Sequence, residues 1–183
     1  MTSLAAQIPN ALTLLRIALV PVLAWWLWER AFAQALGLAA FMGFTDALDG
    51  FLAKRCGWRS RLGALLDPAA DKLMLVVTYV VLGLMGLLPA ILVALVVLRD
   101  LVIVSGALAY RLLVGPLQMQ PTRISKLNTG MQIFLVLLVV LNQIRPLPPA
   151  LLTAAMWLTA LTTVWSGADY VLRWSRKARA QAA

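Results

Sequence analysis

The sequence predicts an all-α protein, a polytopic membrane bundle of six transmembrane helices with both termini on one side. Hydrophobic residues fill 62% of its 183 positions, and the mean hydropathy of +0.88 is far from that of soluble domains. The apolar residues occur in long runs separated by short connections. Because a helix needs about 20 apolar residues to cross a bilayer, the length allows about six crossings. We therefore expect residues 1–183 to form a single membrane domain.

Turn residues and charges divide the chain into these helices. The first helix begins near Asn10, where a proline followed by a capping residue is typical of a helix start. No basic segment precedes this apolar run, so we expect a retained helix rather than a cleaved signal peptide. The connections that separate the later helices are Glu29-Arg30, the basic stretch 54–61, the uncharged turn 83–89, the polar stretch 115–129 and the proline-rich stretch 145–149. The expected helices are residues 8–28, 31–55 and 61–83, a fourth ending at Leu113, a fifth ending at Leu141, and a sixth from 149 to 174.

The loop cations predict the orientation of the bundle. With six crossings, both termini share a side with the loops at 54–61 and 111–126. Lysines and arginines are concentrated on that side, whereas the opposite side holds only Arg30 and Arg145. Because positively charged loops stay in the cytoplasm, we expect the termini to be cytoplasmic, or to face the matrix in an organelle. The membrane that we expect is a bacterial inner membrane. The same distribution accounts for the net charge of +9 without a nucleic-acid partner, because no basic domain is present.

Four of the seven acidic residues are gathered between positions 46 and 71. Asp46 and Asp49 are three residues apart, and Asp67 and Asp71 are four apart. Each pair therefore projects from one face of a helix. Ionisable groups in a membrane are costly and are functional candidates by default, and neighbouring carboxylates repel each other unless a cation neutralises them. Small residues continue these faces and would floor a groove between them: Gly50, Ala53 and Gly63.

The residue types available restrict the chemistry of such a site. Histidine is absent and Cys56 is the sole cysteine, so the commonest zinc ligand is missing and no disulfide can form within the chain. Any metal must be held by oxygen, and any general base must be a carboxylate. The expected cofactor is Mg²⁺ or Mn²⁺, with two ions bridged by shared aspartates.

The spacing of the acidic stretch resembles a known motif. The pattern Asp-x2-Asp-Gly-x2-Ala-Arg-x8-Gly-x3-Asp-x3-Asp marks the CDP-alcohol phosphatidyltransferase family of membrane enzymes. The sequence matches it from Asp46 to Asp71 at seven of the eight fixed positions, and Lys54 stands where the family has arginine. A match over so long a span is much more specific than a short motif.

The resemblance implies a reaction and a set of site residues. The implied reaction transfers a phosphatidyl group from CDP-diacylglycerol to an alcohol and releases CMP, in a homodimer that binds two metal ions. The implied metal ligands are Asp46, Asp49, Asp67 and Asp71, and Asp71 resembles the proposed general base of the family. The positions implied to bind the CDP-lipid donor are Gly50, Lys54 and Ser60, beside Ala53 and Gly63 of the groove. Asn10 and Thr13 belong to a Pro-Asn-x-Leu-Thr-x2-Arg opening that borders the nucleotide pocket in the family, and an ordinary helix start explains them equally well.

The acceptor is inferred from segments outside the motif. The segments around Arg99 and around 120–129 resemble the CMP-forming cardiolipin synthases of this family, whereas the Ile-Pro-Asn and Leu-Leu-Asp-Pro-Ala-Ala-Asp-Lys segments are equally similar to phosphatidylglycerophosphate synthases. We expect phosphatidylglycerol as the acceptor, with glycerol 3-phosphate as the alternative. The candidate acceptor residues are Arg99, Arg123 and Lys126, of which the last two could also be only topogenic charges. Arg99 and Asp100 are adjacent on a helix and need not pair.

Two other classes of protein share part of this pattern. Intramembrane prenyltransferases hold a diphosphate through magnesium and paired aspartates, but they are longer and lack the Asp-Gly-x2-Ala linkage. A cation or proton carrier could use membrane carboxylates, but its acids should be spread across the bilayer rather than gathered at one end. CMP release by purified protein would distinguish the transferase from both.

Overall fold

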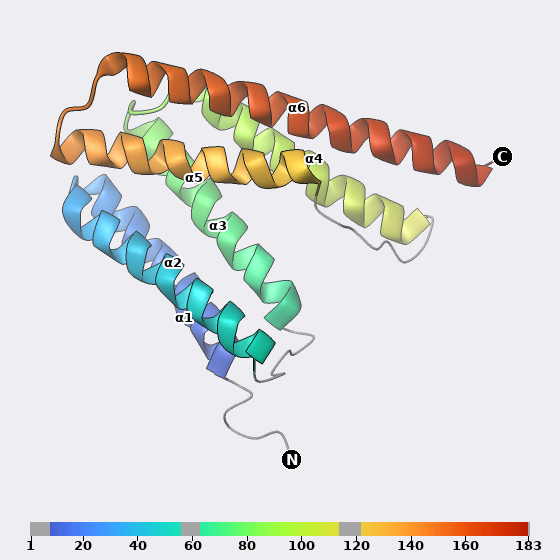
Figure 1. The fold of residues 1–183 in the computed structure, drawn as a ribbon, viewed down its shortest axis with the longest axis horizontal. Coiled ribbons are helices and arrows are strands. Elements are labelled where there is room, and N and C mark those ends of the chain that lie inside the picture. The colour runs from blue at the N-terminus through green and yellow to red at the C-terminus, as the bar shows by residue number, and fades with distance from the viewer. Residues whose placement is uncertain (1–7, 56–62, 114–121, 183) are drawn as a thin grey trace. The chain divides into compact units, whose positions relative to one another are not determined.

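Long helices joined by short turns make up the part of the chain that the structure describes (Figure 1). The computed structural model describes residues 8–55, 63–113 and 122–182, and side chains within 11–48, 69–106 and 122–173. These residues form six helices and no strand, which confirms the predicted all-α class. The helices are α1 (Ile8–Trp28), α2 (Phe32–Arg55), α3 (Gly63–Leu84), α4 (Ala90–Leu113), α5 (Arg123–Ile144) and α6 (Pro149–Ala182).

The boundaries of α5 and α6 differ from the prediction. Helix α5 begins inside the predicted connection 115–129 because Thr122 caps it: the Ser125 backbone N–H donates to Thr122 Oγ1 at 3.1 Å. Helix α6 continues past its predicted end at Trp174, because residues 175–182 contain no glycine or proline and are mostly strong helix formers. The ends of the other helices agree with the prediction to within two residues where the structure describes them.

Three segments among the described residues are long and apolar enough to cross a membrane. They are Ala11–Trp28, Arg123–Ile144 and Pro149–Arg173, and a shorter apolar segment covers Phe32–Leu48. Large apolar side chains on α6, such as Trp157 and Trp165, are exposed, as lipid contact requires. The chain is therefore a membrane protein, and the crossing of the bilayer by all six helices stays a prediction.

The chain divides into two compact units. The first comprises residues up to Leu87 together with 140–146. Within it, α1 packs against both α2 and α3, and the buried side chains include Leu27, Met42 and Tyr79. The central position of α1 means that a polar side chain on its inner face can reach residues of both neighbours.

The second unit comprises residues 88–139 and 147 onwards. Helix α4 packs against α6, and side-chain hydrogen bonds connect α5 to both of them. Val96 and Leu135 are fully buried. Buried polar residues accompany this apolar core, and they form a network that is described below.

Candidate active site

Arg16 on α1 brings together the two aspartates whose side chains the structure describes. Its Nη1 lies 2.6 Å from Asp46 Oδ1 on α2 and donates a hydrogen bond of 2.6 Å to Asp71 Oδ1 on α3. Both carboxylate oxygens contact one nitrogen, so they are separated by no more than twice that distance. Residues 16, 46 and 71 are far apart in sequence and meet because α1 packs on both other helices.

The burial of the three charged groups is unequal. The Arg16 side chain is only 1% exposed, whereas those of Asp46 and Asp71 are 41% and 51% exposed. A guanidinium keeps its charge in proteins, and burying it without a partner would be costly. The arginine therefore requires the two carboxylates, which in turn remain open to an incoming cation or substrate.

The helical register predicted for the acidic stretch is confirmed. Asp46 and Asp49 both lie on the continuous helix α2, and Asp67 and Asp71 both lie on α3, so each pair has the spacing of one helix face. The side chains of Asp49 and Asp67 lie outside the described set. Among the side chains that are described, no three His, Cys, Asp or Glu residues form a metal-binding group. The four-aspartate site therefore stays a prediction of which the structure describes two members.

The predicted donor residues are described only in part. Thr13 is fully buried on α1, one helical turn before Arg16, so it shares the face of α1 that meets Asp46 and Asp71. Several others lie on described helix backbone with side chains outside the described set: Asn10, Gly50, Ala53, Lys54 and Gly63. Ser60 lies outside the described residues.

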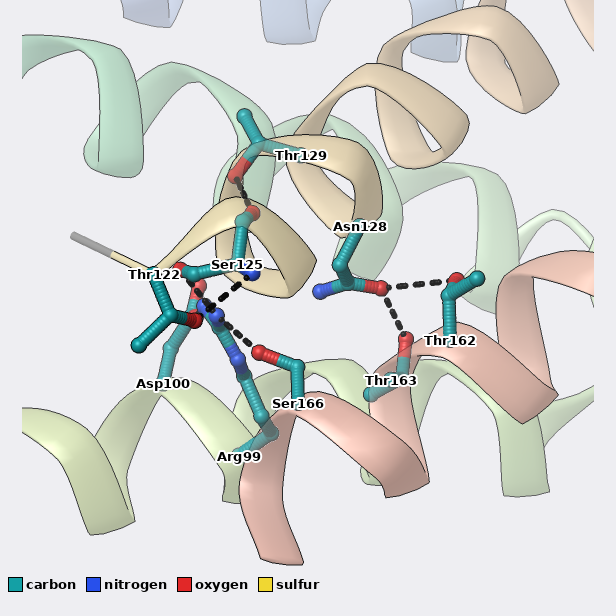
Figure 2. Close-up of polar contacts among 9 residues, drawn as sticks. All are labelled: Arg99, Asp100, Thr122, Ser125, Asn128, Thr129, Thr162, Thr163 and Ser166. Atoms are coloured by element: carbon teal, nitrogen blue, oxygen red, sulfur yellow. Dashed lines mark hydrogen bonds and ion pairs between the residues drawn. The ribbon is translucent and has the colours of Figure 1, made fainter. Parts of the chain in front are cut away.

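Arg99 on α4 is the centre of a second polar cluster, in the second unit. Its Nη1 donates to Asp100 Oδ1 at 2.6 Å, and its Nη2 donates to Ser125 Oγ of α5 at 2.7 Å and to Ser166 Oγ of α6 at 2.6 Å. Figure 2 shows these contacts converging on the guanidinium from three helices. The guanidinium carbon also lies 5.9 Å from the ring centroid of Tyr170, within the range of a cation–π contact.

The Arg99 cluster is closed. Arg99 and Asp100 are both buried, and these hydrogen bonds use both terminal nitrogens of the guanidinium. The two neighbours do pair, because the long arginine side chain reaches across the different directions in which adjacent helix residues point. Arg99 is buried among its neighbouring helices, and its predicted contact with the acceptor stays a prediction. Arg123 and Lys126, by contrast, are exposed in the first turn of α5, on either side of Ser125.

A further hydrogen-bonded group lies one turn along α5. Asn128 is fully buried, and its Oδ1 accepts hydrogen bonds from Thr162 Oγ1 at 3.0 Å and Thr163 Oγ1 at 2.9 Å. Figure 2 shows this group beside the Arg99 cluster, along the same pair of helices. Together the two groups form a polar seam between α5 and α6, and such hydrogen bonds help helices to associate inside membranes.

Neither Arg16 nor the polar seam has a role predicted from the sequence. Arg16 was only the last residue of a helix-opening pattern, since nothing local indicates which acids it meets. The seam has a weak signal: Ser125, Asn128 and Gln132 recur at helical spacing on α5, as Thr159, Thr163 and Ser166 do on α6. Matching polar stripes on two apolar helices indicate that the stripes face each other.

Comparison with known proteins agrees with the motif. Residues 6–165 match the family model described as CDP-alcohol phosphatidyltransferase. The chain is 35% identical over 180 residues to the cardiolipin synthase (CMP-forming) of Homo sapiens, an alignment that covers 89% of this chain and 60% of that protein. It is 32% identical over 187 residues to a chloroplastic CDP-diacylglycerol–glycerol-3-phosphate 3-phosphatidyltransferase of Oryza sativa subsp. japonica, covering 92% of this chain and 57% of that protein.

A shorter match is found in a bacterial protein. The chain is 40% identical over 95 residues to a putative cardiolipin synthase of Mycobacterium tuberculosis, covering 51% of this chain and 45% of that protein. The alignments with the human, rice and mycobacterial proteins thus span at most 60% of the relative's own length.

Proposed function

This chain belongs to the CDP-alcohol phosphatidyltransferase family, and from that premise we propose that it transfers a phosphatidyl group from CDP-diacylglycerol to phosphatidylglycerol, forming cardiolipin and CMP. The observation that carries the proposal is the meeting of Asp46 and Asp71 at Arg16. These are the first and last residues of the acidic motif, and they come from two different helices. Family membership favours this activity over an intramembrane prenyltransferase or a cation carrier.

The donor set fits a divalent cation. Carboxylate oxygens are the ligands that Mg²⁺ and Mn²⁺ prefer. The two described carboxylates contact the same nitrogen at 2.6 Å, so they lie side by side although they come from two helices. The residues proposed to hold two ions are Asp46, Asp49, Asp67 and Asp71. When bound, the metal supplies stabilisation of the charge that develops on the diphosphate and on the leaving CMP.

The transfer exchanges one phosphorus–oxygen bond for another. The acceptor hydroxyl oxygen bonds to the phosphorus that carries the diacylglycerol, and the bond from that phosphorus to the CMP oxygen breaks. The hydroxyl proton passes to a carboxylate, which we assign to Asp71 because its side chain is half-exposed and open to a hydroxyl. The residues proposed to bind the donor are Asn10, Thr13, Gly50, Ala53, Lys54, Ser60 and Gly63.

The acceptor is the part of the proposal with a specific alternative. Arg123 and Lys126 are exposed at the start of α5, where a lipid phosphodiester could arrive laterally. Arg99 donates a hydrogen bond to Ser125 in the same turn of α5. The human relative is named a cardiolipin synthase. The rice relative is named for glycerol 3-phosphate, which makes phosphatidylglycerophosphate synthesis the second candidate.

The setting of the reaction is part of the proposal. The distribution of loop cations supports a cytoplasmic location for both termini and the acidic site, and the proposed membrane is a bacterial inner membrane. Family resemblance supports a homodimer. Cross-linking in native membranes tests the homodimer, and protease accessibility of tagged termini tests the orientation. Both measurements are independent of activity.

The reaction and its acceptor are tested together with purified protein in detergent. We expect CMP release from CDP-diacylglycerol with phosphatidylglycerol present, and a lipid product with the mass of cardiolipin. Glycerol 3-phosphate should be a poor acceptor. Phosphatidylglycerophosphate as the main product would transfer the assignment to the second candidate, and no CMP with either acceptor would refute the transferase.

The metal requirement is tested by chelation. Excess EDTA should abolish CMP release, and Mg²⁺ or Mn²⁺ should restore it, because the carboxylates need a cation to bind an anionic diphosphate. Full turnover in chelator, with metal content measured as absent, would contradict the metal assignment.

A further inference from the structure

The ion pair at Arg16 differs from an ordinary surface pair in where its partners lie. Arg173 and Asp169 are an example of the ordinary kind, with both residues on α6 four positions apart and the arginine 58% exposed. Arg16 is buried, and its two carboxylates come from two other helices. A buried guanidinium has little freedom to move, so it fixes the carboxylates that it contacts.

Arg16 lies on a helix that contacts both acidic helices and carries no acidic residue of its own. Helix α1 has no acidic residue, yet it is the helix that packs on both α2 and α3. Arg16 therefore connects the acidic face of α2 to that of α3 through a third helix. Hydrogen bonds to ligating carboxylates from neighbouring residues are a common means of orienting a metal site.

The negative charges of the acidic stretch also favour a nearby guanidinium such as that of Arg16. Four aspartates carry four negative charges, and Arg16 reduces the total to three. Two divalent ions then leave the site with one positive charge, which favours a bound anionic diphosphate. Without Arg16 the same site with two ions would be neutral.

We propose that Arg16 is a positioning residue for the divalent-cation site, holding Asp46 and Asp71 in the orientation that the cation requires. The inference rests on the proposed function, because it assumes that these carboxylates bind metal. It goes beyond that function by assigning part of the metal site to α1, which supplies none of the proposed metal ligands. Arg16 contacts the carboxylates and acts on the reaction through them.

An alternative role for Arg16 predicts the opposite change in metal affinity. If Arg16 were only a counter-charge that occupies the carboxylates, its removal would release them and tighten cation binding. If it positions them, its removal loosens two ligands from different helices, and cation binding weakens. The sign of the change in Mn²⁺ affinity therefore distinguishes the two roles.

The experiment measures Mn²⁺ binding by electron paramagnetic resonance, with purified protein in detergent and no substrate. We expect Arg16→Gln to weaken Mn²⁺ affinity by about 10- to 100-fold, the range found for residues that orient metal ligands. Arg16→Lys keeps the charge but has a shorter side chain, so its affinity should lie between those of the parent and the glutamine variant. Arg173→Gln, which removes the exposed arginine of the Arg173–Asp169 pair on α6, is the matched control and should leave Mn²⁺ affinity unchanged.

Thermal unfolding in EDTA and in Mn²⁺ gives a second readout. Arg16→Gln should lower the unfolding temperature in EDTA, because α2 and α3 lose their common partner, and Mn²⁺ should protect this variant less than it protects the parent. If the glutamine variant does not fold, the lysine variant decides the question. Parent-like or tighter Mn²⁺ binding in whichever variants fold would overturn the positioning role.

The failure of this inference is distinguishable from the failure of the proposed function. If the parent binds Mn²⁺ but releases no CMP, the transferase is refuted while the effect of Arg16 on metal binding can still be measured. If the parent releases CMP but binds no Mn²⁺ or Mg²⁺, the metal site and the role of Arg16 are both overturned. Metal binding that weakens in the Arg16 variants, in a parent that also releases CMP, supports both.

Discussion

The two polar clusters are each centred on a buried arginine, but the groups around the two arginines differ in exposure. Arg16 and Arg99 are both buried, at 1% and 5% exposure, and each contacts groups on two other helices. The partners of Arg16 are two carboxylates that are half-exposed. The partners of Arg99 are one buried carboxylate, two serine hydroxyls and an aromatic ring.

This difference separates a cluster that can bind from one that holds helices together. At Arg16, two negatively charged carboxylates surround one guanidinium, and both carboxylates are partly exposed. A cation or a substrate can therefore still bind there. At Arg99 the charges are matched within the cluster and two serine hydroxyls accept from Nη2, so the main contribution of this cluster is to hold α4, α5 and α6 together. The variants below should affect activity at the first cluster and stability at the second.

The largest effect is expected at the open cluster. Asp71→Asn removes the proposed base and one metal ligand, and it should lower CMP release by at least about 100-fold. The folded state should persist, because the half-exposed asparagine can still accept a hydrogen bond from Arg16. Turnover and thermal unfolding are measured on the same preparation. Normal turnover by this variant would show that the acidic motif is not the reactive site.

The next effect concerns the closed cluster. Arg99→Gln leaves Asp100 buried without its charge partner, which typically costs about 3–5 kcal/mol of stability. Unfolding monitored by circular dichroism in increasing sodium dodecyl sulfate measures this loss. Arg173→Gln is the control, since the Arg173 side chain is 58% exposed and ion pairs with an exposed arginine four residues along a helix contribute little, about 0.5 kcal/mol. Equal stability of the two variants would mean that the Arg99 cluster does not hold the helices together.

A smaller effect is predicted for the donor. Lys54 lies on α2 beyond Asp46 and Asp49, and a charged hydrogen bond to the diphosphate contributes about 1.5–3 kcal/mol. Lys54→Ala should therefore weaken apparent CDP-diacylglycerol affinity about tenfold or more, while Lys54→Arg should preserve it. Initial rates at varied donor concentration measure both. If alanine and arginine give the same donor affinity, Lys54 is a topogenic charge only.

The smallest effect belongs to the polar seam. Thr163→Val removes a hydroxyl that donates to Asn128, and we expect a loss of about 0.6 kcal/mol, the average for hydrogen bonds between membrane helices. Thr162→Val should cost less, because the Thr162 hydroxyl also lies within 2.9 Å of its own helix carbonyl at Leu158 and is not confined to Asn128. A double-mutant cycle with Asn128→Ala separates the two contributions. The reverse order of the two threonine variants would contradict the geometry of the seam.

Much of the fold was predictable because it depends on local features. Hydrophobic runs, turns at glycine and proline, and charge breaks predicted six helices, and four of them have the expected bounds where they are described. The two errors were also local. The cap at Thr122 starts α5 inside a stretch that reads as a polar loop, and helix-forming residues extend α6 beyond its apolar part.

The candidate site was predictable to the extent that it depends on helical spacing. Aspartates three and four residues apart on α2 and α3 must share helix faces, and the family motif depends on the same spacing. The open state of Asp46 and Asp71 and the closed state of Arg99 did not follow, because exposure depends on which helices pack together.

The amino-acid sequence by itself determined the helices, the acidic faces and the family, and it predicts that any metal is held by oxygen ligands. Only the tertiary structure decided that Arg16 joins α2 to α3, and that Ser125 and Ser166 bind Arg99. The physical reason is the range of the interactions. Periodicity and capping act over a few residues, whereas a buried arginine finds its partners on other helices across 26 to 67 positions of chain only after the helices have packed. An arginine side chain is long enough to reach several acids and hydroxyls, so the helix packing determines which of them it contacts.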